Sequence, residues 1–490
     1  MLLVLVCRLL SAEVKVPALF SDGAVLQRDL PLHFWGTAEP AEQVTITLGS
    51  QSVSVTTDDL GQWSACLPPM AAGGPHEIAI QGQNRILLRD VMIGDVWVAS
   101  GQSNMEFPMR LLKDAEKEIA AARNTSLRFL LVDRTHSEYP LHDLASKGWA
   151  RPSSDTIREF SAVAFYFARE IAQRQRVTVG IIQSTWGGTV AEAWTSLPAL
   201  ASNPALLPVF STYAQMMEDR PHYLLELQRE ARQAKVAQSK GLQPVPLPWR
   251  PEPYMWQPAA LFNAMIAPLT PFPIRGVIWY QGESNSKTDR SPESYGPLFE
   301  TLIRDWRSRW GIGDFPFLFV QISSFLSTPE EDWPVIREAQ RHALALHNTG
   351  MAVTIDIGDP ADVHPLNKKD VGARLALVAR AILYGEKIEY SGPLPRQVTR
   401  EKNELRIWFD HAGKGLTAQG GELSSFEVSG PDGEYRPAQA TIDGETVRVV
   451  NDDIQQPVSL RYGWANSPHC NLFNKDGLPA SPFRMSLPLN

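Results

Sequence analysis

A serine and a histidine far apart in this chain have settings that suit nucleophilic catalysis. Ser103 lies in the string Gly101–Met105 (GQSNM), directly after a short apolar run. A serine in a tight turn between a strand and a helix can expose its hydroxyl beside backbone N–H groups that stabilise an oxyanion. Serine is also a preferred helix N-cap, which is the alternative interpretation of Ser103. His364 favours catalysis, because it is the only one of the ten histidines that we place in a loop of Gly, Asp and Pro after an apolar strand.

A second apolar run ends in a tryptophan and two glycines. Trp186, Gly187 and Gly188 follow it directly. No side chain shields the backbone N–H groups of the two glycines, so either could donate to the oxygen of a tetrahedral intermediate. A Gly pair is also common in an ordinary turn, and that alternative stays open.

A third apolar run is followed by the string Gln281–Asn285 (QGESN), which is rich in amide and acid groups. The side-chain amides of Gln281, Asn285 and Asn104 are candidate oxyanion donors, and removing one such donor typically costs about 3 kcal/mol of barrier. Glu283 is a rival acid that could position the loop, hold a substrate hydroxyl or act in catalysis. We expect a substrate to contact the residues around the nucleophile, namely Gln102, Asn104, Trp186, Glu283 and Asn285.

These residues meet only if the strands before them lie parallel, because open parallel sheets bind ligands beyond the carboxyl ends of their strands. After residue 95, apolar runs alternate with amphipathic stretches, which is typical of a mostly parallel sheet covered on both faces. We predict strands at Val96–Ser100, Val177–Thr185, Gly276–Tyr280, Phe315–Ser323 and Met351–Ile357. We predict helices at Ser161–Arg174, Tyr295–Trp310, Val335–His347 and Asp370–Leu383.

The length of 490 residues indicates about three domains. Short alternating runs between Gly, Asp, Asn and Pro turns predict a β-sandwich over residues 13–94. Residues 95–388 form the predicted α/β domain, and alternation returns over 389–490, where we predict another β domain. The clearest alternating runs of the first region are Gln43–Leu48, Ser52–Thr56 and Glu77–Ile80.

Residues 198–258 interrupt the α/β pattern. This insertion holds a predicted helix at Leu224–Lys240 and then a Pro-rich segment, Pro244–Pro258. The six prolines of this segment allow neither a helix nor a central strand. A long excursion of this kind is typical of a functional rim or lid. Its expected contact residues are Trp249, Tyr254 and Trp256.

The composition excludes several classes of partner. The 46 Lys and Arg against 54 Asp and Glu give a net charge of −8, which offers no basic surface to nucleic acid or an anionic membrane. No stretch reaches the roughly 18 uninterrupted apolar residues of a transmembrane helix. The three cysteines, Cys7, Cys66 and Cys470, are too scattered for a disulfide framework, and no cluster has the spacing of metal ligands. We therefore expect no metal and no cofactor.

The first twelve residues, Met1–Ala12, are an apolar run interrupted by Arg8. The run is similar to the clipped end of an export signal, which leads us to expect a periplasmic or secreted protein. A frayed terminus or an edge strand is the alternative.

Three strings of this sequence resemble blocks of a known enzyme family. GQSNMEFPM at Gly101–Met109, WYQGESN at Trp279–Asn285 and DVHPLNKKDVGARLA at Asp362–Ala376 look like those of the sialate O-acetylesterases, within the wider SGNH-type hydrolases. The likeness covers nearly the whole chain. The flanking strings Pro17–Asp29, Leu261–Phe272 and Asn471–Arg484 also resemble that family.

The resemblance implies a flavodoxin-like catalytic domain in which Ser103 attacks an acetyl carbonyl and His364 acts as general base and then acid. The implied oxyanion donors are the Ser103 backbone N–H, the Gly188 N–H and the Gln281 side chain, with Gly187 nearly equivalent to Gly188. The implied substrate is an O-acetylated sugar, either a sialic acid or a unit of a plant polysaccharide such as xylan or xyloglucan.

The acid of the triad is where this sequence departs from the family pattern. SGNH hydrolases commonly place Asp three residues before the catalytic His, but position 361 is Ala. Asp362 lies two residues before His364, and in an extended loop residues i and i+2 point the same way. We expect Asp362 to orient the imidazole, with Asp359 or a backbone carbonyl as alternatives.

Two other functions remain to be weighed. A lipid esterase or thioesterase is disfavoured, because the excursion is Pro-rich and polar-aromatic and not an amphipathic lid. A non-catalytic carbohydrate-binding protein would have lost its catalytic positions, whereas Ser103 and His364 are both present. A sialate carboxylate is most readily bound by an Arg fork, for which Arg110 and Arg250 are candidates. The oligomeric state is left open.

Overall fold

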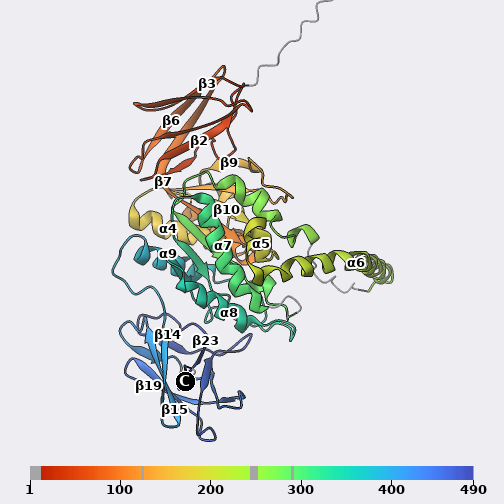
Figure 1. Ribbon diagram of the computed structural model, residues 1–490, viewed down its shortest axis with the longest axis vertical. Helices are drawn as coiled ribbons and strands as arrows, with labels where there is room; N and C mark the ends of the chain where they lie inside the picture. The colour runs from red at the N-terminus through yellow and green to blue at the C-terminus, as the bar shows by residue number, and fades with distance from the viewer. Residues whose placement is uncertain (1–12, 123–125, 243–251, 289–291, 489–490) are drawn as a thin grey trace, which may run out of the picture.

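The computed structural model describes residues 13–122, 126–242, 252–288 and 292–488. Three regions follow one another along the long axis of the molecule (Figure 1). A β-rich N-terminal region lies at one end, a mixed α/β region in the middle and a β-rich C-terminal region at the other end. The twelve residues of the expected export signal lie outside the described part of the chain.

The strand β7 (Arg85–Gly101) belongs to two of these regions. Its first part pairs antiparallel with β6 (Gly73–Gln81), and its second part pairs parallel with the strands of the central sheet. The boundary that we predicted after residue 94 therefore falls inside one continuous strand. Gly94 allows the close passage at this point, because a Cβ there would lie 2.1 Å from the Thr178 carbonyl oxygen.

The N-terminal region consists of short antiparallel pairs, as the alternating sequence predicts. One strand differs, since β1 pairs parallel with β7. The strands are β1 (Val25–Gln27), β2 (Leu32–Thr37), β3 (Gln43–Leu48), β4 (Gln51–Thr56) and β5 (Gln62–Leu67).

The central sheet has the order β13-β12-β11-β7-β10-β8-β9. All neighbours are parallel except β9, which runs antiparallel to β8. Its further strands are β8 (Leu127–Val132), β9 (Ser146–Ala150), β10 (Val179–Thr185), β11 (Gly276–Tyr280), β12 (Phe317–Val320) and β13 (Thr349–Ala352). Of the strands in this order, β7 comes first in the chain and lies between β10 and β11, so later strands lie on both of its sides. Open α/β sheets bind ligands at such a switch point.

Helices cover both faces of this sheet. Trp97 and Trp279 point to opposite faces, since Trp279 is paired with Ser100 and neighbouring strand positions alternate. Trp97 packs edge-on against Phe167 of α4, whereas Trp279 packs against Trp306 of α7. The helices around the sheet are α2 (Ala115–Ala122), α3 (Ser154–Glu159), α4 (Ala162–Gln175), α5 (Leu197–Ser202), α7 (Tyr295–Trp310), α8 (Trp333–His342) and α9 (Lys368–Ile382).

Two four-stranded antiparallel sheets build the C-terminal region, with the orders β14-β15-β20-β19 and β18-β17-β21-β23. They enclose a second hydrophobic core, and β16 pairs with β22 beside them. The strands are β14 (Leu394–Glu401), β15 (Glu404–Asp410), β16 (Leu416–Ala418), β17 (Phe426–Ser429), β18 (Tyr435–Pro437), β19 (Gln439–Asp443), β20 (Thr446–Val450), β21 (Ser459–Tyr462), β22 (Leu472–Asn474) and β23 (Phe483–Ser486).

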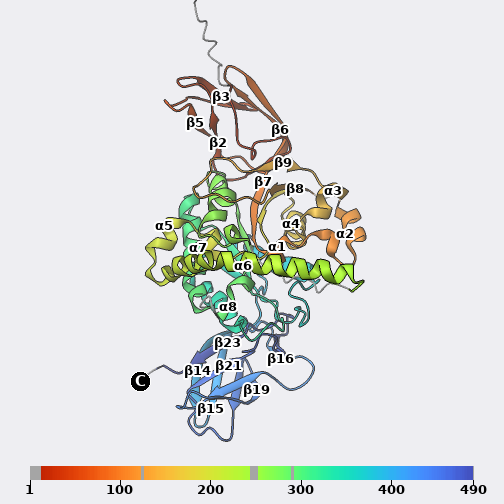
Figure 2. The same ribbon diagram turned by 90° about the vertical axis from the view of Figure 1, so that its right-hand side faces the viewer.

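The helix of the insertion is longer than predicted. The helix α6 (Pro208–Ser239) begins sixteen residues before Leu224 and continues through Pro221. A proline removes the donor to the carbonyl four residues earlier, here that of Met217. Met217 is 41% exposed, so water can replace the missing donor. The helix projects from the α/β region in Figure 1 and lies across its face in Figure 2.

Candidate active site

The turn after β7 places Ser103 at the carboxyl edge of the sheet. Gly101 ends the strand with φ +129°, and a Cβ at this position would lie 2.1 Å from the Tyr280 carbonyl oxygen, so only glycine fits. Gln102 is extended, and Ser103 then begins the short helix α1 (Ser103–Glu106). The Ser103 N–H therefore lies in the first turn of a helix, where backbone N–H groups lack helical acceptors.

His364 reaches Ser103 from the loop that follows β13. Its Nε2 lies 2.8 Å from the Ser103 Oγ, although the two residues are 261 positions apart in the chain. The imidazole is partly buried, which lowers the pKa of His364, and the nearby Lys368 ammonium lowers it further while Asp362 opposes both. A neutral imidazole at hydrogen-bond distance from a serine hydroxyl is the arrangement of a nucleophile and its general base.

Asp362 lies beside the histidine but is not hydrogen-bonded to its ring. Its Oδ1 accepts the His364 backbone N–H at 2.8 Å and lies 3.9 Å from Nδ1. The alternative acid, Asp359, uses its Oδ1 to accept the backbone N–H of Ala361 at 2.9 Å. Asp362 is thus the acid whose charge raises the pKa of His364. Its direct hydrogen bond is with the His364 backbone N–H and not with the imidazole ring.

The two glycine N–H groups of the turn after β10 differ in their hydrogen bonding. The Gly187 N–H donates to Glu106 Oε2 at 2.6 Å, and Glu106 is also ion-paired with Arg134. Among the described residues, no acceptor takes the Gly188 N–H. Gly187 packs against Ser103, since a Cβ on this glycine would lie 3.2 Å from the Ser103 Cβ. Gly188 is therefore the better of the two candidate donors.

The expected oxyanion role of Gln281 is not supported by its contacts. The Gln281 amide is fully buried, and its N–H groups donate to Asn285 Oδ1 at 2.6 Å and to the Thr189 carbonyl at 3.2 Å. No donor of this side chain is left for a substrate oxygen. Asn285 is similarly engaged, because its own Nδ2 donates to Glu192 at 2.8 Å. Both side chains therefore stabilise the loop after β11 through buried hydrogen bonds.

Glu283 lies beneath the turn of Ser103 and is almost entirely buried. It is only 7% exposed, and its Oε1 accepts the Asn104 Nδ2 at 2.6 Å. Burial raises the pKa of this carboxyl. On the other side of Asn104, the Nζ of the buried Lys368 donates to the amide oxygen at 2.5 Å. Glu283 and Asn104 therefore belong to a buried network, and our prediction that they contact the substrate is not supported by their burial.

A cleft of about 730 Å³ opens beside Ser103 and His364. Two guanidinium groups, those of Arg110 and Arg134, line it, and each is ion-paired with a glutamate. Of the five residues expected to contact a substrate, none lines this cleft. Its walls are formed by Ser103, Glu106, Phe107, Pro108, Arg110, Leu111, Leu131, Val132, Asp133, Arg134, Glu159, Gln183, Thr185 and His364.

Comparison with known proteins decides the family. Residues 247–379 match the family model described as a carbohydrate esterase, sialic acid-specific acetylesterase. The chain is 31% identical to the sialate O-acetylesterase of Mus musculus, over 92% of this chain and 90% of the relative. The human protein of the same name is 30% identical over 92% and 88%. The chain belongs to the sialate O-acetylesterase family.

A solved structure supports the same family assignment for this chain. The structure is described as a novel carbohydrate acetylesterase from Xanthomonas citri and is 37% identical, with a TM-score of 0.83. The match covers 96% of this chain and 99% of the other. The resemblance that we inferred from three short strings is confirmed, and the chain is a carbohydrate esterase.

The Pro-rich segment of this family member contributes a buried tryptophan to the site. Trp256 is 7% exposed, and its Nε1 donates to the Gly188 carbonyl at 2.7 Å. Our prediction that Trp256 is a rim contact is wrong, because the buried indole is hydrogen-bonded to the backbone of the turn after β10. Tyr254 is half-buried and stacks on His136 with ring centroids 4.2 Å apart. Trp249 and Arg250 lie outside the described residues.

Replacing Trp256 with phenylalanine should therefore impair the chemistry and not only the binding of a saccharide. The ring is kept but the bond to Gly188 is lost, and a bond of this kind is worth about 1 kcal/mol. We expect kcat to fall by roughly fivefold to tenfold on a small aryl acetate and on an acetylated saccharide alike. Trp408→Phe, at a 38% exposed position, is the matched control. An effect confined to the saccharide KM would contradict this role.

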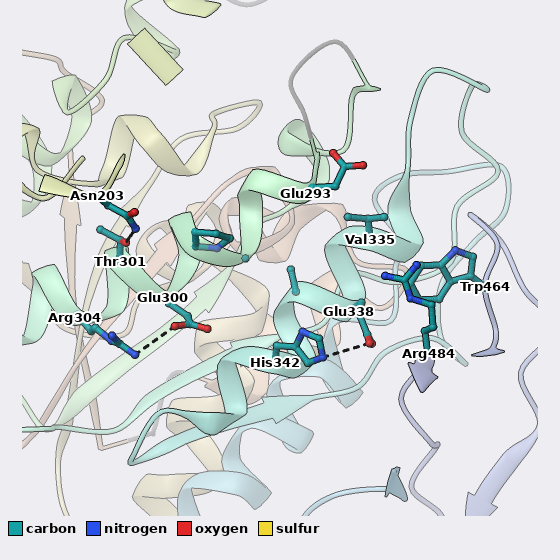
Figure 3. A pocket seen from close by; sticks show the side chains of 13 residues that line it. Asn203, Glu293, Glu300, Thr301, Arg304, Val335, Glu338, His342, Trp464 and Arg484 are labelled. Atoms are coloured by element: carbon teal, nitrogen blue, oxygen red, sulfur yellow. Dashed lines mark hydrogen bonds and ion pairs between the residues drawn. The ribbon is translucent and has the colours of Figure 1, made fainter. Parts of the chain in front are cut away.

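A second pocket of this esterase, about 500 Å³ in volume, lies between α7, α8 and the C-terminal region (Figure 3). The Arg484 guanidinium lies 4.8 Å from the Trp464 ring centroid. The acids in its wall are paired in part, since Glu338 contacts His342 at 3.4 Å. Within the described part of the chain, this pocket shares no lining residue with the cleft at Ser103.

The described residues contain no group of three or more His, Cys, Asp and Glu side chains arranged to hold a metal ion. Within the same residues, no helix combines the length and apolarity that a membrane crossing requires.

Proposed function

We propose that this carbohydrate esterase removes O-acetyl groups from sugars through an acetyl-serine intermediate. The observation that carries the proposal is the 2.8 Å contact between Ser103 Oγ and His364 Nε2, at the mouth of a cleft. The strand order β10-β7-β11-β12-β13 supports a flavodoxin-like SGNH-type hydrolase domain, flanked by the two β-rich regions.

In the proposed reaction, Ser103 Oγ attacks the acetyl carbonyl carbon while His364 Nε2 takes the hydroxyl proton. The carbonyl π electrons move to the oxygen, and the tetrahedral intermediate collapses by breaking the bond to the sugar oxygen. His364 returns the proton to that oxygen, which leaves as a free hydroxyl. Water then attacks the acetyl-serine with the same base, and acetate and the free serine result.

The N–H groups of Ser103 and Gly188 are the proposed oxyanion donors. Both belong to turns at the carboxyl edge of the sheet, and preorganised donors of this kind often supply the largest part of a rate enhancement. Asp362 is proposed to stabilise the imidazolium that forms in each step. Its charge favours the protonated His364, and its bond to the His364 N–H keeps the loop in place.

Two sugar classes are candidate substrates. The names of the curated relatives and of the family model favour O-acetylated sialic acid. The cleft favours a neutral sugar such as a unit of xylan or xyloglucan, because Arg110 and Arg134 are each already paired with a glutamate. A sialate carboxylate would need one of these guanidinium groups to exchange its partner.

Acetate release from a panel of acetylated sialic acid, xylan and xyloglucan tests the proposal. We expect the enzyme to release acetate from at least one sugar and from a small aryl acetate. The variant Arg110→Gln separates the two classes, since loss of the cation should raise KM for a sialate and leave KM for a neutral sugar nearly unchanged. Absence of acetate release from every member would refute the proposed function.

We further propose that the protein acts in the periplasm or outside the cell. The proposal rests on the apolar N-terminal run, Met1–Ala12. Fractionation of cells that express the full chain tests it, and recovery of the protein with residues 1–12 intact in the cytoplasm would contradict it.

A further inference from the structure

A lysine that the proposed reaction does not use is buried next to the candidate active site. Lys368 is the first residue of α9, four positions after His364, and its side chain is fully buried. The Nζ lies 4.9 Å from the Phe107 ring centroid and 5.7 Å from that of Tyr280. Burying an ammonium group is costly unless it is paired and hydrogen-bonded. The contacts of Lys368 therefore indicate what the buried cation does.

The hydrogen-bond partner of Lys368 connects both halves of the candidate catalytic pair. Lys368 Nζ donates to the Asn104 Oδ1 at 2.5 Å. The same amide donates through its Nδ2 to the Val363 carbonyl at 3.0 Å and to Glu283 Oε1 at 2.6 Å. Asn104 directly follows the nucleophile in the chain, and Val363 directly precedes the general base.

The cation decides how the Asn104 amide is oriented. The amide group meets one donor and two acceptors, and only the orientation with its oxygen toward Lys368 satisfies all three. An uncharged, apolar side chain at position 368 would leave the amide oxygen without its buried donor. The turn of Ser103 and the loop of His364 would then be joined less firmly, and small displacements of reacting groups are expensive.

We propose that Lys368 is a positioning residue of this esterase, which locks Asn104 so that the nucleophile turn and the histidine loop keep their catalytic spacing. This inference rests on the proposed serine mechanism. The ammonium group has a second consequence, because a positive charge near His364 disfavours the imidazolium. The cation thereby lowers the pKa of His364, so a larger fraction of the imidazole is neutral at a given acidic pH.

The charged groups around the ammonium fix the sign of this effect. Burial lowers the pKa of Lys368 to about 7, and Glu283 and Asp362 oppose that shift. The lysine is therefore mostly cationic below pH 7. It carries this charge in the acidic range, in which a histidine of lowered pKa titrates. Burial and Lys368 both lower the pKa of His364, whereas Asp362 raises it. Removing the cation should raise the pKa of His364 and move the acid limb of activity to higher pH.

The experiment compares Lys368→Met with the wild type on an aryl acetate across the acidic and neutral range. Methionine keeps the length and burial of the side chain but neither donates nor carries charge. We expect kcat to fall on the order of 100-fold with little change in KM, and the acid limb of kcat/KM to move to higher pH. Lys369→Met is the matched control, since its ammonium is exposed and lies 3.9 Å from Glu118.

Two outcomes would overturn the inference. One is an unchanged kcat and pH profile. The other is a fall of kcat without movement of the acid limb, which a merely structural residue would produce. If Lys368→Met leaves Glu283 as an uncompensated buried charge and fails to fold, the double variant Lys368→Met/Glu283→Gln removes both charges and decides on the same measurements. An inactive wild type would refute the proposed function itself.

Discussion

Ser103→Ala should lower kcat on a small aryl acetate by about 10⁴- to 10⁶-fold, which is the range for loss of a serine nucleophile. The hydroxyl contacts His364, and its loss removes the atom that we propose forms the bond to the acetyl group. Alanine keeps the Cβ that packs against Gly187, so the turn should fold as in the wild type. Stopped-flow or steady-state release of the aryl alcohol, with circular dichroism as a check on folding, measures the effect.

The matched control for this variant lies three residues earlier. Ser100 is fully buried on β7, and among the described residues its hydroxyl has no hydrogen-bond partner. Ser100→Ala should therefore leave activity nearly unchanged. Intact-protein mass spectrometry after rapid quenching should detect an acetyl adduct on the wild type and on Ser100→Ala but not on Ser103→Ala. Turnover by Ser103→Ala at a wild-type rate would refute the nucleophile assignment.

The positions of Ser103 and His364 were predictable because both follow apolar runs. Parallel strands that cross a sheet in the same direction bring their following loops to one edge, however far apart they are in the chain. The helix at Tyr295–Trp310 and the strand at Gly276–Tyr280 were predicted to the residue. The apolar pattern predicted the wrong strand end where apolar residues continue beyond the strand. Ile322 and Ile355 are buried in loops, and the strands predicted there end earlier.

The direction of each polar side chain could not be predicted in the same way. Gln281 and Asn285 follow a strand as Ser103 does, yet they bond to each other and face inward. They are four positions apart, a spacing at which side chains can meet within a turn, but composition alone does not reveal the contact. Glu106 and Lys368 were missed for the opposite reason. Each is an ordinary charged residue in sequence, and only the fold places it beside Gly187 or Asn104.

His364→Ala should be as damaging as Ser103→Ala, since it removes the proposed general base. Asp362→Asn should keep the fold and lower kcat by roughly 10²- to 10⁴-fold, because the imidazolium loses its nearby negative charge. The upper end applies if the 3.9 Å separation from Nδ1 closes to a hydrogen bond when substrate binds. The amide oxygen of asparagine can still accept the His364 backbone N–H, so the loop should stay in place.

The acid limb of kcat/KM distinguishes the two residues that act on His364 by charge. Asp362 raises the pKa of His364 and Lys368 lowers it. Asp362→Asn should therefore move the limb to lower pH, opposite to Lys368→Met, even as both variants lose kcat. Asp359→Asn is the control, because that carboxylate is bonded to the Ala361 N–H within its own turn. A near-wild-type Asp362→Asn enzyme beside a damaged Asp359→Asn enzyme would reassign the acid to Asp359.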